Sequence, residues 1–276
     1  QYIPGIASSL TAVERICELE DIPLEEQGDN IMLENTAGVR FNDVTFSYEE
    51  GSRKILDNFS YDFPPESVTA IVGETGAGKT TLLRLLIALA SPRKGSIEIY
   101  NSDETHKAST LTRGNIVYIP QGNSLISGTI RENLLMGNPN ATDAEIEEMA
   151  DEIGDEVLEL LLDLDATEEQ IKEALHIACA DYIYTLPDGI DSPVAESGGG
   201  LSEGQAQRIS VARSLLRPGS IMIFDEATSA LDEDTEQEML KRLTENKTGK
   251  TLIFVTHRPA VIKHCTQILK IEKTKE

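Results

Sequence analysis

The chain has 276 residues, of which 39% are hydrophobic, and a formal net charge of −24 at pH 7. This length is enough for a large core with at least one subdomain, and the strong acidity argues against a nucleic-acid-binding surface, which should be basic. The three cysteines, Cys17, Cys179 and Cys265, are odd in number and lack metal-ligand spacing, which suits a reducing compartment better than a disulfide framework.

The first strong pattern is a strand, a glycine-rich turn and a helix. Residues 68–72 form a β-branched run that predicts a buried strand, and residues 80–90 predict a helix. The most apolar stretch, 82–90, is too short to span a bilayer and is interrupted by Arg84. The turn fits the pattern G-x-x-x-x-G-K-[ST], which predicts that Lys79 reaches the β- and γ-phosphates of a nucleotide and that Thr80 ligates Mg²⁺. This phosphate cradle comprises Gly73, Glu74, Thr75, Gly76, Ala77, Gly78, Lys79, Thr80 and Thr81.

A second helix start is predicted further along the chain. Ser202 followed by Gln205 has the form of a capping box, so a helix should begin here and run to Leu216, before the breaker at 217–219. Its positive end makes a second place where an anion is favoured.

Two acidic residues follow an apolar strand at 221–224. In a doubly wound parallel sheet, the carboxyl end of such a strand lies beside the phosphate cradle. Asp225 is then placed to hold the Mg²⁺ shell, and Glu226 is left free to orient and deprotonate an attacking water.

These motifs, in this order, resemble the nucleotide-binding domain of ATP-binding-cassette (ABC) transporters, and the resemblance runs from about residue 39 to the C-terminus. It implies an α/β fold with a P-loop NTPase (RecA-like) core, an antiparallel β-subdomain near 39–66 and an α-helical subdomain at about 122–215. The expected division is a linker at 1–36 and the nucleotide-binding domain at 37–276.

The resemblance also implies the site: an ATPase that binds ATP and Mg²⁺. Tyr48 matches the aromatic residue that stacks on adenine. The implied catalytic residues are Glu226, His257, Lys79 and Gln121, and the implied metal ligands are Thr80, Gln121 and Asp225.

Part of the site is expected to act on the opposite subunit. In the family two domains pair head to tail, so Ser202, Gly204 and Gln205 would contact the ATP held by the partner, and 229–232 matches the loop by which the subunits communicate. Glu203 stands where glycine is usual. We expect the site to be intact, because the phosphate contacts of Ser202 and Gly204 do not need that side chain, although an acid there could weaken ATP affinity.

The exporter branch of the family is indicated by three further features. Residues 126–134 and Glu196 are similar to exporter segments, and the pattern at 12–16 resembles the helix that leaves the last membrane span. We therefore expect a membrane domain ahead of residue 1 and a full-length integral membrane protein whose cassette lies at the cytoplasmic face of the cell membrane. The alternative for this region is the leader of a stand-alone ATPase subunit. The glycine run 198–200 should let the helical subdomain swivel.

The stretch between 138 and 179 is longer than the family predicts. Two similar segments begin with capping boxes, at Thr142 and at Thr167, and the first is the expected insertion, an acidic helical segment at about 141–165. Alternatively, any two acidic helix starts look alike. Residues 140–181 carry fifteen acidic side chains against one lysine. This charge predicts a solvated surface, with docking to a basic partner or regulation by cations as the alternatives.

The sequence thus predicts an ATP-driven, head-to-tail dimer that powers export of a substrate across a membrane. The alternatives are a non-transport ABC ATPase and a regulatory module that binds ATP without turnover. The second is disfavoured because Glu226 and His257 are both present. The transported substrate, and the choice between a homodimer and a heterodimer with a degenerate partner, are not encoded in these residues.

Overall fold

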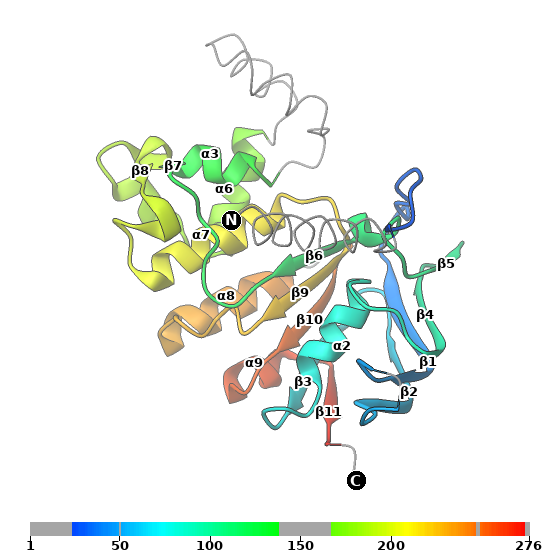
Figure 1. Cartoon of the computed structure of the whole chain (residues 1–276). Helices are drawn as coiled ribbons and strands as arrows, with labels where there is room; N and C mark the ends of the chain where they lie inside the picture. The colour runs from blue at the N-terminus through cyan, green and yellow to red at the C-terminus, as the bar shows by residue number, and fades with distance from the viewer. Residues whose placement is uncertain (1–23, 50, 138–166, 247–248, 274–276) are drawn as a thin grey trace, which may run out of the picture.

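The computed structural model describes residues 24–49, 51–137, 167–246 and 249–273. A parallel sheet stands at the centre, with an antiparallel sheet on one side and a group of helices on the other (Figure 1). Two predicted features, the helix at 12–16 and the insertion at 141–165, lie outside the described residues. Within the described ranges, no helix has both the length and the apolar character that crossing a bilayer requires.

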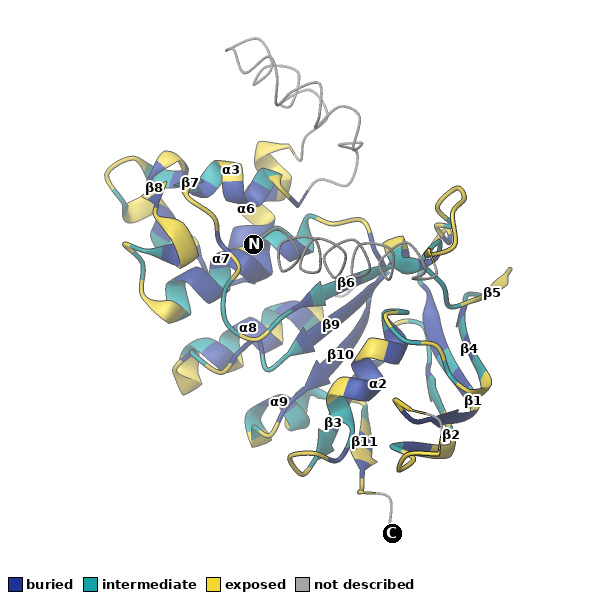
Figure 2. Cartoon of the chain, in the orientation of Figure 1, coloured by how far each residue is buried: buried dark blue, intermediate teal, exposed yellow. Residues whose placement is uncertain are grey.

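The central sheet has five parallel strands. Its three inner strands are largely apolar and buried because both faces of the sheet are covered there. Figure 2 shows β9 (Ile221–Asp225) and β10 (Thr251–Val255) as buried along most of their length. In spatial order the strands are β11 (Gln267–Ile271), β3 (Val68–Gly73), β10 (Thr251–Val255), β9 (Ile221–Asp225) and β6 (Ile116–Ile119).

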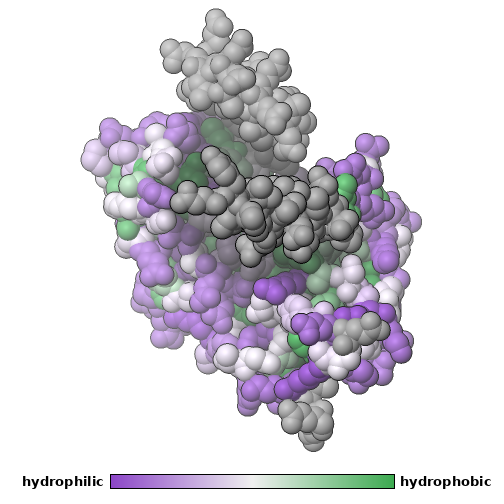
Figure 3. Space-filling view, in the orientation of Figure 1, coloured by the Kyte–Doolittle hydropathy of each residue, from purple (hydrophilic) through white to green (hydrophobic). Residues whose placement is uncertain are grey.

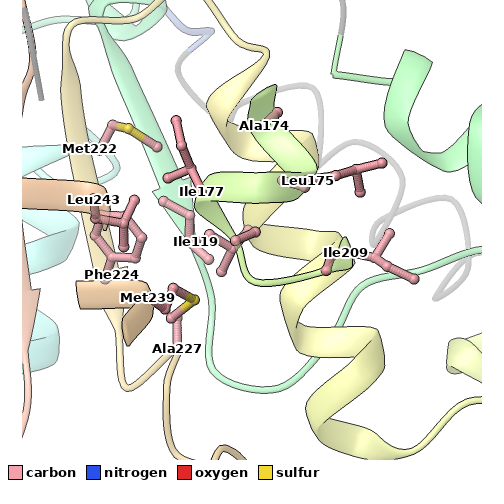
Figure 4. Packing of buried hydrophobic residues seen from close by; sticks show 14 of the residues in the cluster. Ile119, Ala174, Leu175, Ile177, Ile209, Met222, Phe224, Ala227, Met239 and Leu243 are labelled. Atoms are coloured by element: carbon pink, nitrogen blue, oxygen red, sulfur yellow. The ribbon is translucent and has the colours of Figure 1, made fainter. Parts of the chain in front are cut away.

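Alternate residues of these strands pack into two separate cores, as the two-residue period of a strand requires. Met222 and Phe224 of β9 face the cluster made with the helices, which Figure 4 shows. Ile221 and Ile223 face the other cluster, which includes the antiparallel sheet. The visible part of the surface in Figure 3 is mainly hydrophilic, with hydrophobic residues in small separate areas.

The antiparallel sheet is wider than the sequence predicted. Its strands β1 (Gly38–Phe46) and β2 (Leu56–Phe63) fall in the expected region near 39–66. However, β4 (Lys94–Tyr100) and β5 (Thr105–Lys107) come after the cradle and its helix and join the same sheet, because the chain returns to pair β4 with β1.

The helix after the cradle, α2 (Lys79–Leu86), ends earlier than the predicted residue 90. Ala88 adopts a left-handed backbone with φ of 54°, and the Leu89 amide donates back to the Arg84 carbonyl. This 6→1 bond is the kind that closes a helix C-terminus. The apolar residues at 87–90 therefore continue as a turn.

The helical side contains α3 (Ile130–Leu135), α6 (Glu168–Ile177) and α7 (Glu203–Leu215), and α8 (Glu233–Glu245) and α9 (Pro259–His264) pack against the central sheet. The capping boxes predicted at Thr167 and Ser202 are confirmed, since each side chain accepts from the amide three residues on. The remaining short elements are β7 (Gly128–Thr129), β8 (Pro193–Val194), η1 (Arg113–Asn115), η2 (Asp181–Thr185), η3 (Gly189–Asp191) and η4 (Glu196–Gly198).

Candidate functional site

The carboxyl ends of four neighbouring parallel strands meet at one edge of the central sheet. The cradle follows β3, His257 follows the end of β10 closely, Glu226 follows β9 and Gln121 lies just past β6. This is the edge at which open α/β sheets bind ligands. The strand order therefore brings these four predicted segments to the same edge of the sheet.

The cradle, residues 73–81, depends on glycine at two kinds of position. Gly76 and Gly78 have φ of 77° and 104°, in the region that side chains with a Cβ rarely adopt. Gly73 instead allows close approach, because a Cβ there would lie 2.5 Å from the carbonyl oxygen of Ile271 in β11. The last strand of the described chain thus supports the cradle from behind.

The start of α2 has no side-chain cap. Its N-cap residue is Gly78, and no side chain bonds to its first amides. Lys79 curls back so that its ammonium donates to the carbonyls of Gly73, at 2.6 Å, and Glu74, at 3.1 Å. The free amides and this ammonium are the groups that a phosphate chain needs.

A cavity of about 510 Å³ opens directly above the cradle. Its lining joins residues 75–81 to Glu226 and His257, which come from two other strands. A nucleotide-sized space is therefore bounded by phosphate-binding groups on one side and by a carboxylate and an imidazole on another. The remaining lining residues are Arg53, Ile55 and Lys273.

Glu226 lies at the centre of a small polar group. One of its carboxylate oxygens accepts from the Gln121 amide at 3.1 Å, and the other lies 3.6 Å from Nε2 of His257. Its backbone is left-handed, with φ of 50°, which costs a non-glycine residue about 1–3 kcal/mol. The Glu226 amide donates to the Val255 carbonyl at 3.0 Å, and this bond holds the unfavourable turn in place.

Asp225 is oriented by a residue that the sequence reasoning did not assign to the site. The Tyr118 hydroxyl donates to its Oδ2 at 2.7 Å. Burial, and then this bond to a carboxylate, raise the pKa of Tyr118 well above its usual value, so the hydroxyl stays a donor. Nothing local marks Tyr118 in the sequence, because the contact depends on the pairing of β6 with β9.

The predicted metal ligands offer only oxygen atoms: the Thr80 hydroxyl, the Asp225 carboxylate and the Gln121 amide oxygen. This donor set fits Mg²⁺, which prefers oxygen ligands and uses few carboxylates when phosphates are present. Thr80 lines the cavity, and the Tyr118 bond leaves the Oδ1 atom of Asp225 to accept other partners.

Tyr48 lies at the edge of the cradle. Its hydroxyl is 3.2 Å from the Thr81 hydroxyl and accepts from Arg84 at 3.0 Å. The residue is 51% exposed, and its ring packs edge-on against Phe46. These contacts hold Tyr48 beside α2, although Tyr48 does not itself line the cavity.

The second predicted phosphate-binding region lies elsewhere in the chain. Ser202, Gly204 and Gln205 are at the start of α7, on the helical side, and none of them lines the cavity (Figure 1). The Ser202 hydroxyl accepts from the Gln205 amide at 3.2 Å, and Glu203 is exposed. The chain alone therefore brings together one part of the predicted site and leaves this part separate.

Three further residues at the cavity were missed by sequence reasoning: Arg53, Ile55 and Lys273. Lys273 lies within 3.8 Å of the Glu74 carboxylate, so a cation from the end of the described chain stands beside the cradle. Only the pairing of β11 with β3 brings it there, and no motif signals that pairing.

A parallel sheet with a glycine-rich cradle after one strand and adjacent acids after another defines a P-loop nucleoside triphosphatase. The family model described as ABC transporter matches residues 56–229. The chain belongs to the ABC transporter family and carries the ATP-binding and ATP-hydrolysing domain of such a transporter.

Curated relatives resemble almost all of the chain. An uncharacterized ABC transporter ATP-binding protein of Sinorhizobium fredii is 34% identical over 97% of this chain and 42% of its own length. A putative export ATP-binding/permease protein of Rickettsia bellii is 34% identical over 96% of the chain and 42% of its own length. A mycobactin import ATP-binding/permease protein of Mycolicibacterium thermoresistibile is 32% identical over 98% of the chain and, again, 42% of its own length.

Among solved structures, a bacterial Atm1-family ABC exporter with ATP bound matches with a TM-score of 0.73 and 30% identity. The match covers 98% of this chain and 44% of that protein. The chain thus spans less than half the length of the relatives it matches.

Proposed function

We propose that this chain binds ATP with Mg²⁺ in the cavity above the cradle, and that hydrolysis there, in a head-to-tail dimer, drives export of a substrate through a transmembrane domain. The observation that carries the proposal is the cavity lining, in which the cradle, Glu226 and His257 come from three separate strands. A structural glycine turn would not need to face a carboxylate and an imidazole.

The chemistry follows from what in-line phosphoryl transfer to water requires, which is mainly positioning and neutralisation of charge. The cradle amides and Lys79 bind the phosphates. Glu226 orients the attacking water and accepts its proton. Gln121 and His257 flank the Glu226 carboxylate and hold it in place, and His257 also contacts the γ-phosphate. Tyr48 stacks on the base.

Thr80, Asp225 and Gln121 would hold the Mg²⁺ ion, and Tyr118 would keep the Asp225 carboxylate oriented toward it. When bound, the ion supplies charge neutralisation for the phosphate oxygens. The residues of the chain bind the nucleotide, align the attacking water and exclude water from other positions.

The second phosphate-binding region completes the site only from another chain. We propose that Ser202, Gly204 and Gln205 of one subunit close on the ATP bound by its partner, so that the active form is a dimer with two composite sites. Support comes from the position of these residues at an exposed helix start, apart from the cavity of their own chain.

The transport role is supported by the ATP-binding/permease names of the relatives and by the share of their length that this chain matches. We infer a fused membrane domain before residue 1, with the cassette at the cytoplasmic face of the membrane. The relatives are named for both export and import. We favour export because residues 126–134 and Glu196 resemble exporter segments and an Atm1-family exporter matches in structure. The net charge of −24 disfavours a nucleic-acid partner, because a surface that binds nucleic acid should be basic.

The test is the solution mass of the Glu226→Gln variant with and without ATP and Mg²⁺. Removing the general base should trap the closed state, so we expect an ATP-dependent dimer and a loss of turnover of at least about a hundredfold. The matched control is Glu233→Gln, which removes an exposed carboxylate at the start of α8 and should behave as the parent. A monomer at saturating ATP would contradict the proposed dimer mechanism for this domain.

A further inference from the structure

One buried carboxylate lies close to the nucleotide site without taking part in the proposed chemistry. Glu236, in the first turns of α8, is only 1% exposed. A charged group so deeply buried needs a specific partner. Its Oε1 atom accepts from Arg258 at 2.9 Å and from the Thr228 hydroxyl at 2.6 Å.

Arg258 makes more contacts than pairing with Glu236 requires. Its guanidinium also donates to the Thr228 carbonyl at 2.7 Å and to the Leu231 carbonyl at 3.3 Å from each of two nitrogens. Thr228 and Leu231 belong to the segment 227–232, here called the linking loop. One planar side chain therefore holds both limbs of this loop against α8, a geometry that suits the fork of arginine better than a lysine ammonium.

The linking loop touches both halves of the predicted site. At its start, the Ser229 amide donates to the carbonyl of Glu226 at 3.0 Å. On its other side, the Ala230 amide donates to the Gln207 side chain of α7, and a Cβ on Gly204 would lie 2.9 Å from the Ala230 carbonyl oxygen. The loop thus bridges the cavity side and the start of α7.

Arg258 directly follows His257, the cavity residue whose Nε2 lies 3.6 Å from Glu226. The Arg258 amide is bound to the Thr256 hydroxyl at 3.0 Å, so residues 256–258 form a fixed turn. A displacement of His257 therefore shifts the root of the Arg258 side chain, and with it the two loop carbonyls that the guanidinium holds.

We propose that Arg258, anchored by Glu236, is a positioning residue that transmits the state of His257 to the linking loop and so to the Ser202 end of α7. This rests on the proposed function, because the state in question is the presence of the γ-phosphate. Arg258 itself does not line the nucleotide cavity. It decides whether the part of the site offered to the partner responds to what is bound in the cavity.

The test measures amide hydrogen exchange of residues 227–232 with ATP and Mg²⁺, and with ADP and Mg²⁺, in a Ser202→Asp, Glu226→Gln background that blocks turnover and pairing. In this background protein, which serves as the parent for the comparison, we expect exchange to be about threefold slower or more with ATP than with ADP, because only ATP supplies the γ-phosphate. Adding Arg258→Gln should abolish this difference while nucleotide affinity, measured with a fluorescent ATP analogue, stays within about twofold.

The matched control is Arg113→Gln. Arg113 also holds two backbone carbonyls, those of Ile87 and Ala88, and a carboxylate, that of Glu25, but it does not line the nucleotide cavity. This variant should keep the ATP-specific difference. If the difference persists in Arg258→Gln, or is missing from the parent with ATP bound, the inference is wrong.

Arg258→Lys keeps the protein testable if Arg258→Gln is unstable, because the ammonium still neutralises Glu236. We expect thermal stability near that of the parent but no ATP-specific difference, since lysine cannot span both loop carbonyls. Full transmission with lysine would overturn the role of the fork. These readouts come from a monomer, so they remain separate from the dimer test, whose failure would instead remove the proposed function.

Discussion

The chain contains two helix starts that are predicted to bind phosphate, and they are built differently. α2 begins at Gly78, which has no side chain, so the first amides of α2 face the cavity without an internal partner. α7 begins at Ser202, whose hydroxyl accepts from the Gln205 amide, while the Gln205 side chain accepts from the Ser202 amide.

This difference indicates what each helix start can do alone. Unsatisfied amides at a helix start favour an anion, and a capping box supplies partners for two of them from within the chain, here the amides of Ser202 and Gln205. The α2 start therefore favours a bound anion, whereas the α7 start is stabilised by its own capping box. The α7 start is then available at the surface to contact a nucleotide held by another subunit. One is a binding site in the single chain, and the other becomes one only in a dimer.

The largest expected effect comes from disabling the two helix starts in different chains. Lys79→Ala should remove phosphate binding at the cradle. Ser202→Asp should keep the cap, since aspartate is a good N-cap residue, but place a negative charge toward the γ-phosphate of the partner. Each variant alone should lose ATPase activity almost completely. An equal mixture should recover about a quarter of the parent activity, because half the dimers contain one intact composite site.

This experiment tests whether the two helix starts act on the same nucleotide from different chains. ATPase activity measured at increasing ratios of the two variants should peak near equal amounts. An inactive mixture of two folded variants would contradict a site shared between chains, and a fully active Ser202→Asp variant would show that the α7 start does not contact phosphate. Circular dichroism of the Ser202→Asp variant should show an intact helix content.

The parts of the site that sequence analysis predicted are those fixed by local chemistry. The cradle requires glycine at Gly76 and Gly78, where φ is positive, and the capping boxes at Thr167 and Ser202 are each defined by residues three apart. The apolar strand that ends at Asp225 and Glu226 is also recognised from adjacent residues alone. Each of these features is determined within about ten residues of sequence.

The parts that escaped prediction depend on pairing between distant strands. Tyr118 reaches Asp225 only because β6 pairs with β9, and Lys273 reaches the cradle only because β11 pairs with β3. Likewise, β4 joins the antiparallel sheet from beyond the cradle. Such contacts are decided by tertiary register, which a single sequence does not display.

A smaller effect is expected from removing the Tyr118 hydroxyl, which orients the Asp225 carboxylate near the cavity. Tyr118→Phe removes the donor to Asp225 and should raise the Mg²⁺ concentration for half-maximal ATPase activity by about tenfold, as loss of a hydrogen bond to a metal-binding carboxylate commonly does. Tyr100→Phe is the matched control, because the Tyr100 hydroxyl donates to the Asp62 carboxylate at the same 2.7 Å in the antiparallel sheet.

Titration of ATPase activity with Mg²⁺ at saturating ATP distinguishes the two variants. Tyr100→Phe should leave the Mg²⁺ requirement unchanged. If Tyr118→Phe also leaves the Mg²⁺ requirement unchanged, the Asp225 carboxylate is oriented without the Tyr118 hydroxyl. The metal site would then depend less on the pairing of β6 with β9 than we infer.

The smallest effect is expected from removing a hydrogen bond that Tyr182 makes to the first turn of α7. The Tyr182 hydroxyl donates to the Gln205 carbonyl at 3.1 Å, and burial raises the pKa of Tyr182 to about 12. Because the folded pKa is raised above the unfolded one, the protonated form stabilises the fold at neutral pH, and this contribution is lost as the pH rises from about 10 toward 12. Tyr182→Phe should cost about 1 kcal/mol at neutral pH, since it removes one hydrogen bond.

The same variant should flatten the alkaline part of the stability curve, because the phenylalanine ring has no proton to lose. Urea unfolding between pH 8 and about 11 measures both effects. Tyr184→Phe, at a side chain that is 49% exposed, is the comparison and should change the curve less. Equal alkaline slopes for Tyr182→Phe and the parent would mean that the α7 start does not depend on this tyrosine, and that its capping box alone keeps it ready for a partner.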